Sequence, residues 1–217
     1  MHRLIARQTR FATGGPESAP LVVSDLLPES LGAAVAAVSA WLRAARVPAI
    51  IVGGVAASLL GRPRLTRDVD ALVDLPEDDW ALALTTAANF DIAPRIGDPL
   101  DFARRSRVLL LRHRASQINI DIILGALPFE REAVAAGETR SLGDIEIRLP
   151  RVEDLMVMKA IAHRPRDMID LEALLEAHPN ANLERVRGQV REFSVAATLP
   201  ELLKDLDSLV ATVRTRG

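Results

Sequence analysis

The spacing of apolar residues predicts alternating helices and strands over the first two thirds of the chain. Ala and Leu recur at helical spacing in ESLGAAVAAVSAWLRAAR, and the β-rich AIIV that follows ends in Gly53-Gly54. VAASLLG then predicts a short helix, and residues 68–75 alternate between polar and apolar, as in a half-buried strand. Further along, DDWALALTTAA predicts a helix, residues 94–99 a turn, RVLLLRH and QINIDIIL two strands, and ETRSL with DIEIRL a small hairpin.

From Arg151 onward the pattern is helical. RVEDLMVMKAIA, PRDMIDLEALLEA, NLERVRGQVREF and LPELLKDLDSLVATV predict four helices, and Pro165 suits the first turn of the second. The predicted fold class is α+β, with a short mixed sheet and flanking helices in residues 27–149 and a helical bundle in residues 150–217. The composition of residues 1–26 predicts a flexible tail, with a transit peptide as the alternative.

Composition narrows the classes of protein to consider. The 217 residues are 49% hydrophobic and 26% charged, which is typical of a globular chain. No apolar run approaches the roughly 18 residues of a membrane span, so no membrane partner is expected. The absence of Cys excludes disulfides, zinc ribbons and thiol nucleophiles, and leaves carboxylates, Lys, His and hydroxyls for catalysis. A net charge of -2 argues against a general binder of polyanions, and 3% aromatic residues with no Tyr argue against a base-stacking platform for single strands.

Candidate chemistry begins at Asp68 and Asp70. Two residues apart on a strand, their side chains leave the same face, with Cα atoms about 6.6 Å apart at roughly 3.3 Å per residue. Such a pair can bind divalent cations such as Mg²⁺, which takes oxygen ligands from protein and phosphate. Asp121, on the polar face of QINIDIIL, would complete a three-carboxylate metal site and could accept a proton from an attacking hydroxyl. The alternatives are a solvated strand face for the pair and an exposed edge strand for Asp121.

The turn at Gly53-Gly54 precedes the acidic strand. Glycines allow phosphate oxygens to approach the backbone, and a helix that starts there offers N–H groups and a favourable dipole. Ser58 lies one turn into this helix, as a phosphate contact or as a packing residue. The order of strand, Gly-Gly, helix and carboxylate strand is more specific than any one of these features.

Lysine is rare in this chain. Only Lys159 and Lys204 occur among the 27 Lys and Arg residues. Lys159 falls on the predicted buried stripe of a helix that starts at Val152, where an aliphatic residue is expected. A desolvated Lys requires an anion, and a nucleotide phosphate or Asp167 would serve. The alternatives are a Lys that extends to the rim of the core, and an Asp167 that only complements the helix dipole.

Arginines gather in residues 95–114, which hold six Arg, one His and two Asp, and Arg62, Arg64 and Arg67 lie near the acidic strand. Clusters of this kind bind phosphate oxygens of a triphosphate or of a nucleic-acid acceptor. With an RNA acceptor, Arg104, Arg105 and Arg107 would contact its backbone. An ordinary surface rich in Arg is the alternative.

Three stretches, VGGVAASLLGRPRLTRDVDALV, NIDIILGALPFERE and LPRVEDLMVMKAIAHRPRDMIDLEAL, resemble the polymerase-β-like nucleotidyltransferase superfamily. More closely, they resemble the AbiEii-type nucleotidyltransferase toxins and their uncharacterised relatives, over about residues 47–175. The resemblance implies a nucleotidyltransferase fold. It implies the following roles: metal binding by Asp68 and Asp70, triphosphate contacts by Gly53, Gly54 and Ser58, and a match of Lys159 and Asp167 to the family's helical motif.

The expected reaction is the Mg²⁺- or Mn²⁺-dependent transfer of a nucleoside monophosphate from an NTP to an acceptor hydroxyl. The acceptor is a tRNA end, a small molecule or a protein side chain. The resemblance also implies a cytoplasmic toxin of a toxin–antitoxin or phage-defence pair, with an antitoxin protein as partner. Two alternatives stay open: a catalytically idle binding module with this fold, and a small-molecule nucleotidyltransferase of the antibiotic-resistance type.

Overall fold

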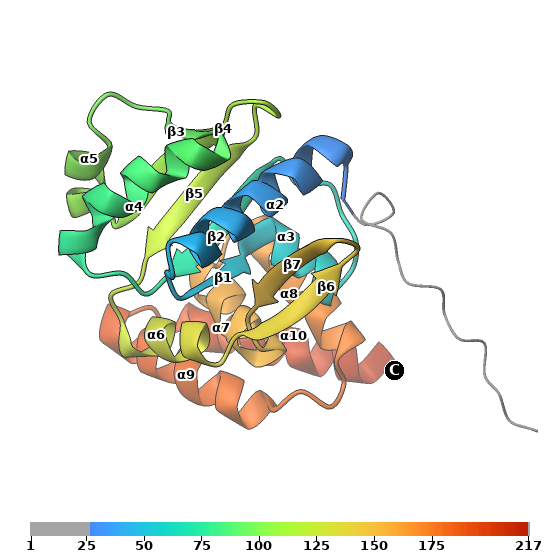
Figure 1. Cartoon of the computed structure of the whole chain (residues 1–217). Helices are drawn as coiled ribbons and strands as arrows, with labels where there is room; N and C mark the ends of the chain where they lie inside the picture. The colour runs from blue at the N-terminus through green and yellow to red at the C-terminus, as the bar shows by residue number, and fades with distance from the viewer. Residues whose placement is uncertain (1–26, 217) are drawn as a thin grey trace, which may run out of the picture.

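A five-stranded mixed sheet forms the centre of the molecule (Figure 1). Its strands, in spatial order, are β1 (Ala49–Val52), β2 (Asp68–Val73), β5 (Asn119–Leu124), β4 (Val108–His113) and β3 (Ile92–Pro94). β2 and β5 are parallel, and all other neighbours in this sheet are antiparallel. The computed structural model describes residues 27–216, so the tail predicted for residues 1–26 lies outside the described residues.

Helices and a hairpin surround this sheet and confirm the α+β prediction. The N-terminal helices are α2 (Glu29–Ala44), α3 (Gly53–Leu60), α4 (Trp80–Ala87), α5 (Pro99–Ser106) and α6 (Pro128–Ala135), with short 3-10 turns at Glu77–Asp79 and Ala88–Phe90. The hairpin of β6 (Glu138–Leu142) and β7 (Ile145–Leu149) packs against β1 and α2. The C-terminal helices are α7 (Val152–Ala162), α8 (Pro165–Ala177), α9 (Leu183–Ala197) and α10 (Glu201–Arg216).

One face of the sheet packs on α2 and α4 to form the main core. Alternate residues of β2 and β5 are buried there, as period-two burial requires: Val69, Ala71, Val73, Ile120, Ile122 and Leu124. Trp41 of α2 is also buried in this core, and its indole N–H donates to the carbonyl of Ala83 in α4 at 3.1 Å. This contact holds the two helices together over the sheet.

The opposite face carries a smaller core at one end. Leu72 of β2 packs there with Ile50 and Val52 of β1 and with residues of α6. The polar face predicted for residues 68–75 is therefore wrong at Leu72, because α6 covers that end of the strand. The strand itself ends at Val73. Only the other end of this face, which carries Asp68 and Asp70, stays polar.

Three elements were not predicted from the sequence: β3, α5 and α6. β3 has three residues, and α5 and α6 have eight each, which is too short for a clear periodic signal. Both helices begin with proline, and Glu130 accepts hydrogen bonds from the N–H groups of Ala126 and Leu127 at 2.7 and 2.9 Å. Proline at the first position favours the start of both helices, and Glu130 in addition caps the N-terminus of α6.

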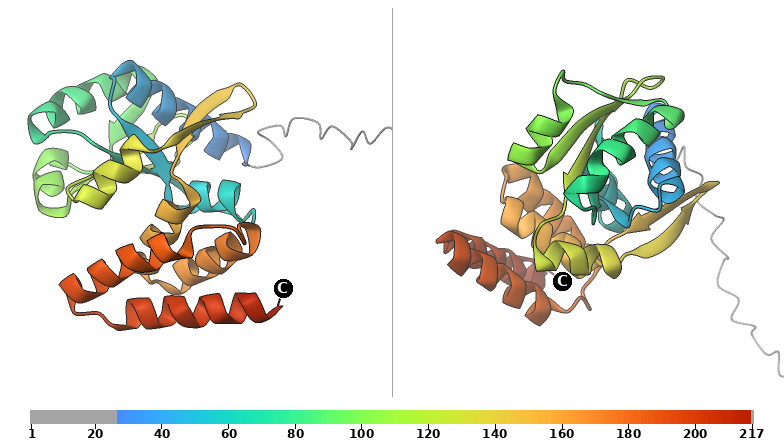
Figure 2. Two further views of the ribbon diagram at one scale, coloured as in Figure 1. Left: turned by 90° about the horizontal axis from the view of Figure 1, so that it is seen from below. Right: turned by 60° about the vertical axis from the view of Figure 1, so that its left-hand side comes forward.

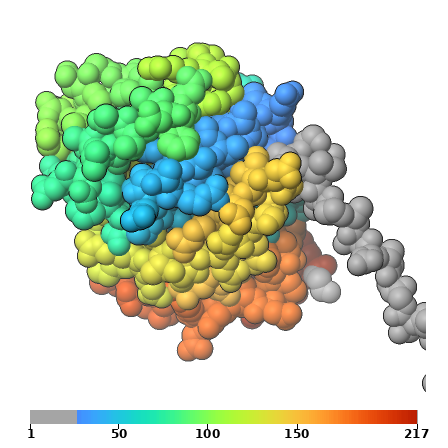
Figure 3. All heavy atoms as spheres, in the orientation of Figure 1, coloured from blue at the N-terminus to red at the C-terminus, as the bar shows by residue number. Residues whose placement is uncertain are grey.

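The four C-terminal helices form a layer beside the sheet and its flanking helices (Figure 2). In the space-filling view they lie together along one side of the molecule (Figure 3). α7 contacts α8, α9 and α10, and α3 contacts α8. The end of α3 is joined to the residue that follows α8 by a polar contact, in which His178 lies 2.6 Å from the carbonyl oxygen of Leu60. Within residues 27–216 no helix is long and apolar enough to cross a membrane.

Candidate active site

Three carboxylates meet on the polar end of the sheet. Asp70 and Asp121 are partners in the register of the parallel strands β2 and β5, and Asp68 pairs in the same way with Asn119. Residues paired in register point to the same face, and neighbouring strands lie about 4.8 Å apart. The structure thus brings Asp68, Asp70 and Asp121 to one place, although the last is 51 residues or more from the other two in sequence.

The Gly53-Gly54 turn lies directly against Asp70. Gly53 has a φ of +60°, and a Cβ there would overlap the Asp70 carboxylate; a Cβ at Gly54 would overlap the hydroxyl of Thr66. The backbone N–H of Gly54 hydrogen-bonds to Asp70, and Thr66 donates to Asp68 Oδ1 at 2.9 Å. Glycine is therefore required at both positions, because the side chains of Asp70 and Thr66 leave no room for a Cβ. The helix α3 begins at the acidic site.

Burial and neighbouring charges raise the pKa of two of these carboxyl groups. Burial and the charges of Asp68 and Asp121 raise the pKa of Asp70 to about 6, against the opposing effects of Lys159 and the Gly54 N–H. Burial likewise raises the pKa of Asp121, although Arg95 donates a hydrogen bond to it. Excess negative charge is thus concentrated where a cation would be favoured.

Lys159 is buried beside this cluster and bonded to two acids of α8. Its Nζ lies 3.0 Å from Asp167 Oδ1 and 2.7 Å from Asp170 Oδ2. Arg64 donates to both oxygens of Asp170 at 2.6 and 2.8 Å, and Arg164 donates to Asp167 at 2.6 Å. Burial opposes the ionisation of both acids, but these hydrogen bonds and the charge of Lys159 outweigh it and hold each pKa below its ordinary value. Asp167, one of the two anions predicted for Lys159, is in contact with it.

Asp170 was not singled out from the sequence, and Arg64 was predicted as a phosphate contact rather than as a partner of Asp170. Asp170 follows Asp167 by three residues on a helix, so both face the same side, and this spacing was the available signal. The partnership of Arg64 with Asp170 joins residues 106 apart, and no local pattern predicts it.

A cavity of about 420 Å³ opens between this face of the sheet and the helices α6 to α9. One end is polar, with Gly53, Asp70, Asp121, Lys159, Arg164 and Asp167. The other end is apolar, with Leu72, Val108, Ile123, Leu127, Phe129, Met158 and Phe193. A cavity that joins charged groups to an apolar wall suits a small molecule with a charged part and a flat apolar part.

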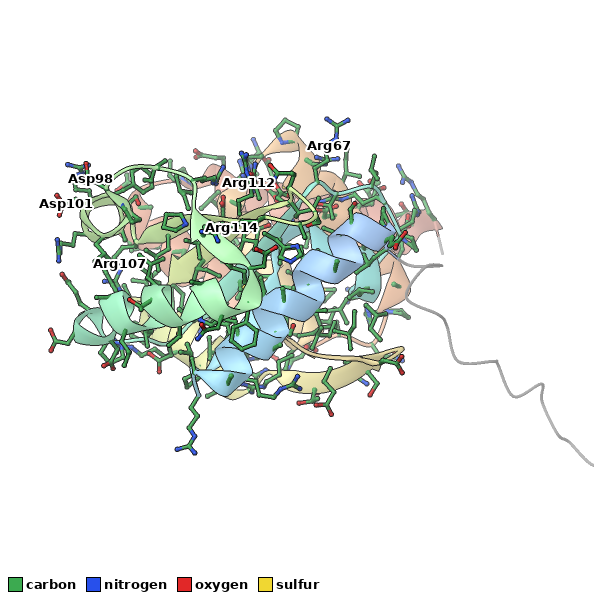
Figure 4. All side chains as sticks on the ribbon, turned by 45° about the horizontal axis from the view of Figure 1, so that its top comes forward. Arg67, Asp98, Asp101, Arg107, Arg112 and Arg114 are labelled. Atoms are coloured by element: carbon green, nitrogen blue, oxygen red, sulfur yellow. The ribbon has the colours of Figure 1, made fainter. Side chains whose placement is uncertain are left out.

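Three of the predicted phosphate contacts, Gly54, Ser58 and Arg67, do not line this cavity. Ser58 is 3% exposed, and its hydroxyl lies 2.9 Å from the carbonyl oxygen of Gly54 and 3.0 Å from that of Arg64. The geometry of Ser58 corresponds to its alternative role as a packing residue. Arg67 is exposed and precedes Asp68 at the start of β2 (Figure 4).

The arginines of residues 95–114 do not form one basic surface. Arg107 donates to the carbonyls of Leu124 and Gly125 at 3.1 and 2.9 Å, and its guanidinium lies 5.0 Å from the centre of the Trp80 ring. The expectation that Arg107 contacts an acceptor is wrong, since these bonds turn it inward. Arg104 pairs with Glu77 and Asp101. Arg112 and Arg114 are exposed, as Arg67 is (Figure 4).

The residues fit a divalent cation by chemistry, although the side chains are not arranged as ligands. Within residues 27–216 no group of three or more His, Cys, Asp or Glu is placed to hold a metal ion. Asp68 is bonded to Thr66, and Asp121 to Arg95. Three carboxylates on one sheet face are nevertheless the oxygen donors that Mg²⁺ and Mn²⁺ prefer, and the raised pKa of Asp70 reflects negative charge that a cation would compensate.

Comparison with known families identifies the chain. The family model described as "Nucleotidyl transferase AbiEii toxin, Type IV TA system" matches residues 38–211. This chain belongs to the AbiEii nucleotidyltransferase toxin family. A comparison of its sequence with curated proteins finds no match.

Solved structures agree on the fold of this AbiEii-family protein. An antigenic nucleotidyltransferase-like protein from Paracoccidioides brasiliensis is similar with a TM-score of 0.52 and 16% identity, over 86% of this chain and 95% of that one. The antibiotic-resistance factor ANT(2'')-Ia is similar with a TM-score of 0.51 and 15% identity, over 76% of this chain and 91% of that one. The nucleotidyltransferase fold predicted from the sequence is confirmed, and the AbiEii-family protein is a nucleotidyltransferase.

Proposed function

We propose that this AbiEii-family protein transfers a nucleoside monophosphate from an NTP to an acceptor hydroxyl, with Mg²⁺ or Mn²⁺ as cofactor. The observation that supports the proposal is the register pairing of Asp70 with Asp121, next to Asp68 and the N-terminus of α3, at the polar end of a cavity. In the transfer, the acceptor oxygen forms a bond to the α-phosphorus. The bond from that phosphorus to the bridging oxygen breaks, and pyrophosphate leaves with the electron pair.

The proposed roles follow from where the side chains lie. Asp68, Asp70 and Asp121 would hold the divalent cation, which would neutralise phosphate charge and orient the α-phosphate. Asp121 would also accept the proton of the acceptor hydroxyl, because its raised pKa makes it a stronger base than an ordinary Asp.

The triphosphate would lie along Gly53, Gly54 and Lys159. The two glycines present backbone without side chains at the start of α3, and Lys159 and Asp167 form part of the cavity wall. Arg67 would contact a phosphate from outside the cavity. Ser58 would support the turn rather than touch the nucleotide, because its hydroxyl is buried against two carbonyls.

For the acceptor we propose tRNA. The family is one of toxins, and the exposed Arg67 and Arg112 lie at the Asp68 end of the sheet, because Arg67 precedes Asp68 and Arg112 pairs in register with Asn119, the partner of Asp68. Arg114 is exposed just after β4. An antitoxin protein is the proposed functional partner. NTPs and tRNA are both cytoplasmic, which supports a cytoplasmic location for the reaction.

The test is label transfer from each of four α-³²P NTPs, with Mg²⁺ or Mn²⁺, to total tRNA, to a panel of antibiotics or to protein. We expect labelled tRNA with the wild-type protein and at least a hundredfold less with Asp70→Asn. Label on an antibiotic alone would identify the small-molecule alternative. Binding of Mg²⁺–NTP with no transfer to any acceptor would identify an idle binding module and contradict the proposal.

A further inference from the structure

Arg95 forms an ion pair with Asp121, the carboxylate that the proposed reaction requires as a metal ligand and base. It follows β3 directly, and its backbone N–H donates to the carbonyl of Leu110 in β4 at 3.1 Å. Leu110 is in turn the register partner of Asp121. The side chain of Arg95 reaches past β4 to Asp121 and donates a hydrogen bond to Oδ1. The ion pair is therefore fixed by the sheet and does not depend on a chance surface contact.

The guanidinium of Arg95 is not fully used by Asp121. The Arg95 side chain is 25% exposed and that of Asp121 is 33% exposed. The Nε of Arg95 is buried and has no hydrogen-bond partner among the residues that the structure describes. A guanidinium with an unused buried donor is under-satisfied and would gain from an anion with several oxygens, such as a phosphate.

A divalent cation and Arg95 would compete for the same oxygen atoms. A cation bound to Asp70 and Asp121 would repel the guanidinium and remove its partner. The phosphates of an NTP would supply a new partner of higher charge, and Arg95 contacts Asp121, which lines the polar end of the cavity.

We propose that Arg95 is a displaceable lock on Asp121, which leaves the carboxylate for a phosphate of the nucleotide when cation and nucleotide bind together. This inference rests on the proposed function, because it takes Asp121 as a metal ligand. Its consequence is that the nucleotide-free protein binds a divalent cation weakly, and that cation and nucleotide favour each other's binding. The ion pair of Arg95 with Asp121 thus disfavours binding of a cation that arrives without a nucleotide.

The test measures Mn²⁺ binding to the nucleotide-free protein by electron paramagnetic resonance. We expect Arg95→Met to bind Mn²⁺ about tenfold more tightly than the wild type, a change of about 1.4 kcal/mol. Arg95→Lys keeps a charge that can pair with Asp121. Its Mn²⁺ affinity should therefore stay within about threefold of that of the wild type. Arg95→Met should also bind Mg²⁺–ATP more weakly, because a phosphate contact is lost.

Arg112→Met is the matched control. Arg112 lies on the same face of the sheet, on β4, but donates to the amide oxygen of Asn119. This variant removes one positive charge without freeing a carboxylate, so its Mn²⁺ affinity should rise far less than that of Arg95→Met. Equal effects of the two variants would overturn the lock in favour of a general charge effect.

The double variant separates the lock from the proposed metal site. Arg95→Met in an Asp121→Asn background should no longer tighten Mn²⁺ binding, and tightening that persists there would overturn the lock. If Asp68→Asn and Asp70→Asn leave Mn²⁺ binding unchanged, the metal site itself fails, and with it the proposed function. Unchanged Mn²⁺ affinity in Arg95→Met, with Asp70→Asn impaired, would overturn the lock alone.

Discussion

The Nζ of Lys159 lies 2.7 Å from Oδ2 of Asp170, and both side chains are almost completely buried. Asp170 also accepts two hydrogen bonds from Arg64, which lies in the chain that leads into β2. The C-terminal helices are thereby tied to the strand that carries Asp68 and Asp70. The position of the Lys159 charge at the cavity depends on an acid that lies outside the cavity wall.

Asp170→Asn should destabilise the fold. It leaves Arg64 and Lys159 without their shared charge in a buried place, and breaking one side of a buried pair costs about 3 kcal/mol. Glu176→Gln, on the same helix, is the control: its pair with Arg62 is exposed and should contribute less than about 1 kcal/mol. Urea unfolding of the two variants measures the loss in free energy of unfolding. Equal losses would contradict the larger contribution expected from the buried Asp170 network.

Lys159→Met should weaken nucleotide binding. The stem is retained and the charge at the cavity wall is removed, so we expect at least a tenfold loss of NTP affinity, about 1.4 kcal/mol or more. Calorimetric titration at a temperature well below the melting transition measures it. A variant with wild-type affinity and turnover would reduce Lys159 to a structural ion pair with Asp167 and Asp170.

Asp70 should make the metal-free protein less stable as pH rises. Its pKa is about 6 in the folded protein against 3.8 for the ordinary residue, so between these values the folded state keeps a proton that the unfolded state loses. Asp70→Asn removes this dependence. Its gain in free energy of unfolding over the wild type should be larger at pH 7 than at pH 4, by on the order of 1 to 2 kcal/mol.

The measurement is denaturant unfolding with a chelator present at both pH values. Other titrating groups are common to the two proteins and cancel in the difference. A gain that is the same at pH 4 and pH 7 would be inconsistent with a raised pKa at Asp70.

Gly53→Ala should damage both fold and site. The residue has a positive φ, and an added Cβ would overlap the carboxylate of Asp70, so we expect a loss of about 1 to 3 kcal/mol. Gly97→Ala adds a Cβ that meets no atom within 4 Å and serves as the control, with a change of less than about 1 kcal/mol. Thermal melts of both variants decide, and equal stability would contradict the close approach of Gly53 to Asp70.

Local sequence patterns predicted most of the helices and strands and the acidic site. Period-two alternation identified β2 and β5, and the carboxylates on their polar faces were therefore predictable. That Asp121 pairs with Asp70 in register depends on strand order, which the sequence did not specify. The partners of Asp170 and Asp121 were beyond prediction for the same reason, since Arg64 and Arg95 reach them through tertiary contacts.

The arginine segment shows the limit of composition as a guide. Arg107 was counted with a basic surface, but Trp80 and two carbonyls hold it inward. Charge density along a sequence does not say which side of the backbone each side chain takes. Only the pairing of β4 with β5 fixes that.

The most direct test of the paired carboxylates is the rate of pyrophosphate release from Mg²⁺–NTP in the presence of tRNA, for Asp121→Asn and Asp74→Asn. Asp74 follows β2 at the end of the strand away from Asp68, is partly exposed and lies 3.8 Å from Arg131, so it is an acid adjoining the same strand without a proposed role. We expect Asp121→Asn to lose at least about a hundredfold in rate, as removal of a general base does, and Asp74→Asn to keep the wild-type rate. A wild-type rate in Asp121→Asn would contradict the account.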